Sequence, residues 1–238
     1  MILILASQQD PGAAALVAGW AGARLLTPAD LSLPGWALAA GPSSGTGPAA
    51  GRGIADGEPF GTDQVRCLVS LLASVEAADL TWMSPEHREY VASEMTSFLG
   101  HWLTTLDHRC LVAPSYASLA GPCPPTAAWA AAAGVPLATD DDADAPRALV
   151  TVVGDQVFRV GGSQTCKIDE ALTRRLCRMA ASQGVALLSA VVTREPGDPL
   201  GRLEAVLSAP VVRTTEVRLA VRDLVADRDR NALMEVAS

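Results

Sequence analysis

Short apolar runs separated by turn residues characterise the amino-terminal part of the chain. Residues 2–6 form an apolar run too short for a helix. Gln-Gln-Asp-Pro-Gly follows, then an alanine-rich stretch to Ala23 and a second short run at 24–26. This order predicts a strand, a helix and a strand, which is the beginning of an open α/β sheet. The next predicted strand is 65–69.

The longest helical pattern begins after Ser84. Serine is a favoured N-cap, Pro85 suits the first turn, and Glu86 lies near the positive end of the helix dipole. The helix is predicted to run to about residue 106, because its apolar residues recur at helical spacing. These residues are Tyr90, Val91, Met95, Phe98, Leu99, Trp102 and Leu106.

Strands and helices continue to alternate beyond this helix. Residues 110–113 are predicted as a strand that ends at Pro114, and 126–133 as a short helix closed by Gly134. Residues 148–159 predict a β-hairpin with Gly-Asp at its turn. The remaining predicted elements are a helix at 168–183, strands at 185–193 and 201–207, and an amphipathic helix at 215–227.

The composition adds limits on class and location. The 238 residues are 49% hydrophobic and 4% aromatic, a length that suits one large domain or two modest ones. The formal net charge of −8 argues against a nucleic-acid partner or an anionic membrane. No apolar run approaches the roughly 20 residues that span a bilayer, and no basic signal-peptide start is present. The five cysteines form no Cys-x-x-Cys pair, so we expect a cytoplasmic protein with reduced thiols.

Several segments occur along the chain in an informative order. They are residues 2–5 with 25–31, the helix around Glu94, the passages 111–114 and 127–139, the hairpin 152–158, and Leu203-Glu204-Ala205-Val206. This order resembles the ATP-grasp superfamily, particularly the ligases related to glutathione synthetase, the ribosomal-protein glutamate ligases and the ligases that modify ribosomal peptides. The resemblance implies an α/β fold. An amino-terminal open parallel sheet would occupy residues 1–136, and a truncated ATP-grasp-like α+β portion would occupy 137–238.

The chain departs from this family where ATP is held. The resemblance implies that active members insert, between the positions of Thr139 and Ala148, a small domain that closes over ATP and carries lysines for its phosphates. Here eight residues separate the two positions and reach at most about 28 Å when extended. The only lysine, Lys167, lies beyond the hairpin.

The magnesium ligands that the resemblance implies are also incomplete. Glu204 is retained, but Val206 stands in place of the family's asparagine and residues 190–193 provide no carboxylate. Phosphoryl transfer depends on metal ions and basic residues to stabilise charge. We therefore expect a catalytically degenerate member without metal or cofactor. It would be an accessory subunit of a biosynthetic pathway that holds a peptide or amino-acid substrate, or that pairs with an active ATP-grasp ligase.

Two other functions are open. The chain could be a minimal or partner-completed ATP-dependent carboxylate–amine ligase that uses ATP and magnesium, with Glu204, Arg202 and Arg159 as candidate catalytic residues. It could also be a homodimeric scaffold. For Glu204, an ion pair with Arg202 or Arg213 is the structural alternative to a role in catalysis.

Three tryptophans are candidates for a peptide-binding groove. Trp82, Trp102 and Trp129 belong to the amino-terminal half, which the resemblance associates with the acceptor substrate or peptide. Aromatic side chains are effective anchors for a bound peptide. Core filling is the alternative, because the chain has few other large residues.

Each remaining polar motif has a structural and a functional interpretation. The aspartates of residues 140–144 could form a cation site or a solvated turn. The glycine-rich segment 41–53 could be a phosphate-binding loop or a flexible connection. His87, His101 and His108 lie on or just after the same predicted helix. His101 and His108 are two helical turns, or about 10 Å, apart, which is too far to share one metal ion and favours surface histidines. Cys123 is a candidate nucleophile that lacks a histidine beside it in the sequence.

Overall fold

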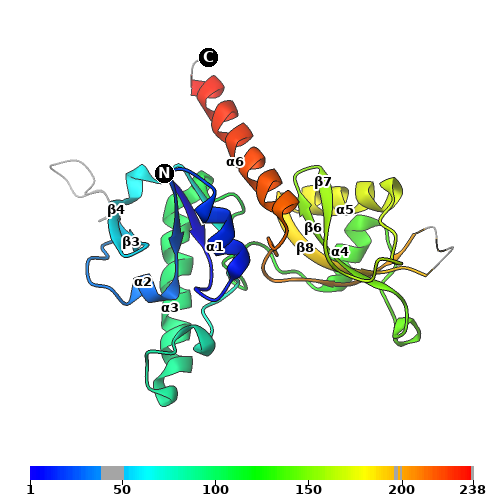
Figure 1. Ribbon diagram of the computed structural model, residues 1–238, viewed down its shortest axis with the longest axis horizontal. Coiled ribbons are helices and arrows are strands. Elements are labelled where there is room, and N and C mark those ends of the chain that lie inside the picture. Colours follow the sequence, from blue (N-terminus) through cyan, green and yellow to red (C-terminus); the bar gives the residue numbers. More distant parts are fainter. Residues whose placement is uncertain (39–50, 196–197, 199, 237–238) are drawn as a thin grey trace. The chain divides into compact units, whose positions relative to one another are not determined.

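The computed structural model describes residues 1–38, 51–195, 198 and 200–236, with side chains described to residue 230. By its internal contacts, the chain divides into two compact units, Met1–Ala120 and Gly121–Ser238 (Figure 1). Helix α4 (Thr126–Ala133) packs on elements of the second unit. The division at residue 136 that the sequence suggested stays a prediction about domains.

A three-stranded parallel sheet forms the centre of the first unit. Its order is β2 (Ala23–Leu26), β1 (Ile2–Leu5) and β5 (Cys67–Ser70). All four residues of β1 are buried, as in the central strand of a parallel sheet, and this explains the uninterrupted apolar run. Helix α1 (Pro11–Ala18) connects β1 to β2, and the Asp10 carboxylate caps its first turn. The predicted strand, helix and strand are confirmed.

A β-hairpin that the sequence analysis did not predict lies between β2 and β5 in the chain. Strands β3 (Arg52–Ala55) and β4 (Glu58–Gly61) pair antiparallel around Asp56 and Gly57. Both turn residues have a positive φ, 52° and 72°, which is the conformation of a tight two-residue hairpin turn. Strand β3 includes the end of the glycine-rich segment, of which residues 41–50 lie outside the described part of the chain.

Helix α3 (Pro85–Leu106) packs its apolar face into the core of the first unit (Figure 1). Leu99, Trp102 and Leu106 are buried, as the predicted stripe requires. Tyr90 is 71% exposed, so this residue lies outside the buried face. The predicted bounds of the helix are confirmed.

The strand predicted at residues 110–113 is wrong. Cys110 makes a single strand-like bridge to Leu68, and Leu111 N donates to Leu68 O at 2.7 Å. No further bridge to β5 follows in the described part of the chain, so this segment is a loop that touches the edge of the sheet.

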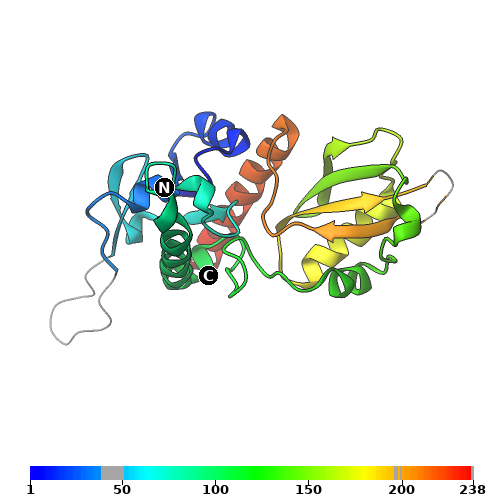
Figure 2. The ribbon, with the colours of Figure 1, turned by 90° about the horizontal axis from the view of Figure 1, so that it is seen from below.

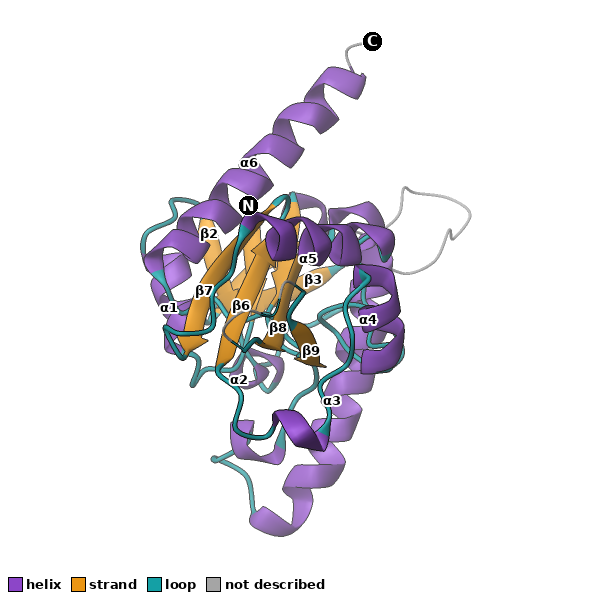
Figure 3. Ribbon diagram, turned by 90° about the vertical axis from the view of Figure 1, so that its right-hand side faces the viewer, coloured by secondary structure: helices purple, strands orange, loops and turns teal. Residues whose placement is uncertain are grey.

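The second unit contains a four-stranded antiparallel sheet. Its order is β7 (Gln156–Gly162), β6 (Arg147–Val153), β8 (Leu187–Thr193) and β9 (Arg202–Val206), as Figure 3 shows. The predicted hairpin is confirmed as β6 and β7, and Gly154 in its turn has a φ of 59°. The predicted strands at 185–193 and 201–207 correspond to β8 and β9.

Helices α4 and α5 (Glu170–Ser182) lie on one face of this sheet (Figure 2). The other face carries two fully buried hydroxyl groups, Thr151 Oγ1 and Ser189 Oγ, which lie 2.7 Å apart. Thr151 donates to Val211 O and Ser189 accepts from Val211 N, both at 2.8 Å. The chain after β9 is therefore fixed to this face. The buried residues that meet on the helix side are Ala148, Val150, Val152, Ala190 and Val192 of the strands, and Leu172, Leu176 and Met179 of α5.

Helix α6 (Thr215–Val236) extends beyond its predicted end at residue 227, because residues 228–236 contain no glycine or proline. Among the helices of the described residues, none combines the length and the apolar character needed to cross a membrane. The short elements are α2 (Pro28–Leu31) and 3₁₀ turns at Thr62–Gln64, Ala77–Asp79, Asp107–Arg109 and Asp140–Asp142.

Candidate functional site

Strand β8 ends at the edge of the sheet where β6 and β9 begin. We call this edge, with Arg147, Thr193, Arg202 and Glu204, the sheet rim. Arg147 at the start of β6 pairs in register with Thr193 at the end of β8, and Thr193 pairs with Arg202 at the start of β9. Directly opposed residues of antiparallel strands project to the same face. At the rim, a threonine therefore lies between two arginines. Thr193 Oγ1 is buried and has no hydrogen-bond partner among the described atoms.

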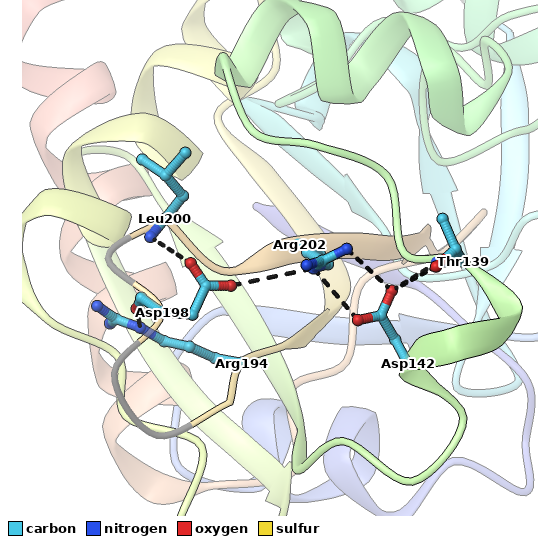
Figure 4. Close-up of polar contacts among 6 residues, drawn as sticks. All are labelled: Thr139, Asp142, Arg194, Asp198, Leu200 and Arg202. Carbon is cyan, nitrogen blue, oxygen red and sulfur yellow. Dashed lines mark hydrogen bonds and ion pairs between the residues drawn. The ribbon is translucent and has the colours of Figure 1, made fainter.

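Asp142 lies in the segment between Thr139 and β6 and connects this segment to Arg202 of the sheet rim (Figure 4). Its carboxylate accepts hydrogen bonds from Thr139 N at 2.7 Å and Thr139 Oγ1 at 2.9 Å, and its other oxygen lies 3.2 Å from Arg202 Nε. Only 5% of Asp142 is exposed. The backbone hydrogen bond from Thr139, with contributions from the Thr139 hydroxyl and Arg202, holds the pKa of Asp142 below its ordinary value of 3.8.

Glu204 forms an ion pair with Arg147. Arg147 Nε donates to Glu204 Oε2 at 2.6 Å, and the two side chains are 44% and 35% exposed. The register between β8 and β9 shifts by one residue at this point, which leaves Glu204 without an opposite residue on β8. Its partner is thus neither of the two arginines that the sequence suggested.

Arg194 organises the connection between β8 and β9 (Figure 4). Its guanidinium donates to Asp198 O, Lys167 O and the Asp169 carboxylate at 2.7, 2.9 and 2.7 Å, and its side chain is 11% exposed. The hydrogen bond from Arg194, with a backbone N–H of α5, lowers the pKa of Asp169. The Asp198 carboxylate also lies 4.0 Å from Arg202 Nε, so the contacts of the two arginines form one polar network.

Two of the three candidate catalytic residues share a strand, but each has its own ion-pair partner. Arg202 and Glu204 lie on β9, whereas Arg159 lies on β7, and strands β6 and β8 separate the two. The guanidinium of Arg159 donates to the carbonyl oxygens of Ser163 and Cys166, in the segment that follows its own strand. A catalytic role for the three residues stays a prediction.

The three candidate tryptophans differ in exposure. Trp102 of α3 and Trp129 of α4 are 1% and 2% exposed, whereas Trp82 is 46% exposed. Trp102 makes edge-to-face contacts with Trp36 and Phe60, with ring centroids 5.5 and 6.3 Å apart. Burial favours core filling for Trp102 and Trp129. Peptide binding stays a prediction, for which Trp82 has the most accessible ring of the three.

The other polar candidates lie on the surface of their units. His87, His101 and Cys123 are exposed, and His108 Nδ1 lies 3.3 Å from Asp107 Oδ2 with both side chains more than 80% exposed. The hydrogen bond with His108 lowers the pKa of Asp107. In the described part of the chain, no three histidine, cysteine, aspartate or glutamate side chains are grouped so that they could hold a metal ion.

Sequence reasoning missed the roles of Asp142, Arg147 and Arg194. A signal existed for Asp142, because Thr139 and Asp142 have the spacing of a capping box. The aspartate run as a whole indicated a solvated turn, and Asp140 and Asp141 are indeed exposed. No local signal identifies Arg147 or Arg194, whose partners are distant in the sequence or are backbone carbonyls.

The charges of the sheet rim are matched within the chain. Arg147 holds Glu204, and Arg202 lies between Asp142 and Asp198. A magnesium–nucleotide complex needs several free oxygen ligands and positive groups for the phosphates. The described rim residues do not fit such a group as they stand.

Comparison with known proteins identifies the fold. No family model matches the sequence, and no curated protein matches it. Solved structures match over nearly the whole chain. The macrocyclase MdnC bound with the precursor peptide MdnA, from Microcystis aeruginosa MRC, has a TM-score of 0.63 at 10% identity, covering 96% of this chain and 100% of that chain.

Two further structures agree with this match. The RiPP-associated ATP-grasp ligase of Chryseobacterium gregarium, in complex with ADP and a leader and core peptide, has a TM-score of 0.61 at 9% identity, covering 95% and 96% of the two chains. The ATP-grasp ligase PsnB complexed with a minimal precursor has a TM-score of 0.57 at 13% identity, covering 95% and 97%. The chain therefore has an ATP-grasp-like α/β fold, and the resemblance seen in the sequence is confirmed at the level of fold.

Proposed function

We propose that this chain is an ATP-grasp-like accessory protein that binds a peptide and does not transfer phosphoryl groups by itself. The observation that carries the proposal is the closed connection between Thr139 and β6. The link consists of the capped 3₁₀ turn Asp140–Asp142, which Asp142 ties to Arg202 on β9, and four further residues that lead into β6. The segment in which an active ATP-grasp ligase would carry its lid is thus a short, hydrogen-bonded link.

The ion pairs of the sheet rim support the same proposal. A bound triphosphate would have to take Arg147 from Glu204 and Arg202 from Asp142, and either change would leave a carboxylate next to the phosphates. The negative charges of the carboxylate and of the phosphates would repel each other. Phosphoryl transfer needs the opposite, an excess of positive charge and metal ions around the phosphates.

A peptide is the ligand that the fold favours. The solved structure of MdnC contains the precursor peptide MdnA, that of the Chryseobacterium gregarium ligase contains a leader and core peptide, and that of PsnB contains a minimal precursor. We propose that this chain retains peptide binding and that an active ATP-grasp ligase, acting in the same biosynthetic pathway, supplies the chemistry. A homodimer is the alternative assembly, and light scattering of the chain alone and with the ligase distinguishes the two.

Calorimetry tests both parts of the proposal. Titration with ATP and magnesium should give no saturable heat up to millimolar nucleotide, and micromolar binding would contradict the proposed lack of phosphoryl transfer. An array of synthetic peptides, tiled over the short reading frames that neighbour the gene, should contain at least one saturable ligand. If the array contains none, the peptide-binding part of the proposal is wrong.

A partner-completed ligase is the second candidate, favoured by the accessibility of Arg202 and Glu204. Their side chains are 40% and 35% exposed, so a partner chain can reach them. ATP consumption with the partner and peptide present, lost in Glu204→Gln and retained in Glu216→Gln, would support this function. Glu216 is an exposed carboxylate in the first turn of α6 and is not part of the sheet rim, so it is a matched control. No turnover under any of these conditions would exclude it.

A further inference from the structure

A cavity of about 500 Å³ opens between helix α3 and the loop of residues 114–119, within the first unit. We call it the α3 cavity. Neither the sheet rim nor the tryptophan candidates contribute to it. The α3 residues that line it are Thr96, Ser97, Gly100, His101 and Thr104, and the remaining lining residues are Ala73, Ser74 and the loop from Pro114 to Leu119.

Gly100 is the one glycine of α3 and lines the α3 cavity. A Cβ atom at this position would lie 3.7 Å from Leu119 Cδ2, which is an ordinary van der Waals contact. Alanine would therefore fit, and it would stabilise the helix, because glycine is unfavourable in a helix interior. A side chain longer than alanine at this position would extend into the cavity, so position 100 is suited to a substitution that fills it.

The loop wall is held rigidly by its own hydrogen bonds. Ser115 N donates to Ser118 O at 2.9 Å, the Ser115 hydroxyl accepts from Ala117 N at 3.3 Å, and Leu119 N donates to Ala73 O at 2.8 Å. At the tip of this loop the Tyr116 side chain is fully exposed. An aromatic ring on a fixed loop loses little conformational entropy when it contacts a ligand.

The lining of the α3 cavity is uncharged apart from the titratable ring of His101. Its helix hydroxyls are already hydrogen-bonded: Thr96 Oγ1 donates to Ala92 O, and Ser97 Oγ donates to Ser93 O. A charged group would find no opposite charge there, and its desolvation would be uncompensated. The cavity therefore suits an uncharged side chain, aromatic or aliphatic.

The amino-terminal half of the same helix is acidic. Glu86, Glu89 and Glu94 are exposed, and the guanidinium of Arg88 is directed to the carbonyl oxygens of Met83 and Thr81 rather than to these carboxylates. A ligand that enters the α3 cavity and extends along the helix thus meets a negative surface. Complementary positive charge on the ligand would speed its association and select against acidic sequences.

We infer that the α3 cavity receives an uncharged aromatic or aliphatic side chain of a peptide whose neighbouring basic residues face Glu86, Glu89 and Glu94. This inference rests on the proposed peptide-binding function. It locates the peptide-binding site at the α3 cavity of the first unit and predicts which peptide sequences bind there. Tyr116 packs against the inserted side chain, and Gly100 lies beside it.

Titration of the full chain with dye-labelled synthetic peptides tests the assignment. The probes are Lys-Lys-Ala-Phe-Ala-Lys, the same peptide with serine for phenylalanine, and Glu-Glu-Ala-Phe-Ala-Glu. Binding by fluorescence anisotropy should be at least tenfold tighter for the first probe than for the other two. Amide resonances of Gly100, His101 and residues 115–118 should shift in its nuclear magnetic resonance spectra. Equal binding of the three probes, or shifts confined to other residues, would overturn the inference.

Two variants locate the site on the protein. Gly100→Leu fills the α3 cavity and should weaken binding of the first probe at least tenfold, whereas Thr105→Leu, at an exposed position of the same helix that does not line the cavity, should not. Tyr116→Ala tests the loop wall without disturbing the core, because this side chain is fully exposed. If an array peptide still binds Gly100→Leu and Tyr116→Ala with unchanged affinity, the proposed function stands and its assignment to the α3 cavity is wrong. If the wild-type chain binds no peptide of either set, the proposed function itself fails.

Discussion

Arg202 Nε lies 3.2 Å from Asp142 Oδ1, and this contact joins the first residue of β9 to the short link that follows Thr139. The Asp142 side chain is 7% exposed and the Arg202 side chain 40%, so the carboxylate lies inside while the guanidinium reaches solvent. The carboxylate also accepts both hydrogen bonds of Thr139. One aspartate thus closes the turn and attaches it to the sheet.

Acid should destabilise the second unit through Asp142 and Asp169. Both have a folded-state pKa below 3.8, so their contribution to the free energy of unfolding is complete above the unfolded pKa and is lost as the pH falls through the lower folded values. Urea unfolding should show little change from this source between about pH 7 and 5 and a decline below about pH 4. The double variant Asp142→Asn/Asp169→Asn should show a smaller decline than the wild type, and an equal decline would contradict the assignment.

Arg194 should be hard to replace, even by lysine. Its guanidinium serves three acceptors at once and is mostly buried, whereas a single ammonium group cannot reach all three in the same geometry. We expect Arg194→Lys to lower the free energy of unfolding by about 1–3 kcal/mol, from the hydrogen bonds lost at a buried position. Chemical denaturation measures the change. Arg174→Lys, at an exposed position of α5, is the matched control and should have an effect near zero.

Alanine variants of Trp102 and Trp82 should differ in stability, because the first ring is part of the core and the second is partly exposed. Trp102→Ala removes a buried ring from the aromatic contacts of the first unit and should cost about 3–5 kcal/mol of unfolding free energy. Trp82→Ala should cost less, about 1–2 kcal/mol, because nearly half of this residue is already exposed to solvent. Thermal and urea unfolding of both variants provide the comparison. A large loss of stability in Trp82→Ala would show that this ring has a structural role.

The ion pair between Arg147 and Glu204 should contribute little to stability. Both side chains are more than a third exposed, and exposed pairs couple by about 0.2–1 kcal/mol. A double-mutant cycle with Arg147→Gln and Glu204→Gln measures the coupling energy, which should decrease further in 0.5 M salt, where screening lengths are only a few ångströms. A coupling above about 3 kcal/mol would contradict this prediction, because only a desolvated pair reaches such a value.

Elements with a strong local signal could be predicted from the sequence. The apolar run of β1, the capped start of α3 at Ser84 and the Gly134 closure of α4 all depend on residues within a few positions of one another. The hairpin at β3 and β4 was missed, because its strands are four residues each and its turn follows a glycine-rich segment. The strand at 110–113 was predicted wrongly, because an apolar run cannot reveal whether a neighbouring strand edge continues beside it.

Local sequence patterns were enough to predict most strands and helices and their apolar faces, because these depend on short-range periodicity and turn chemistry. The order of these segments also resembled the ATP-grasp superfamily, and the fold confirms that resemblance. Tertiary structure alone decided which charges meet. Arg147 and Glu204 are 57 positions apart, and Asp142 and Arg202 are 60 apart. Such partners are chosen by strand register and by a one-residue shift in β9, and a register is an outcome of packing the whole sheet, which no local pattern in the chain encodes.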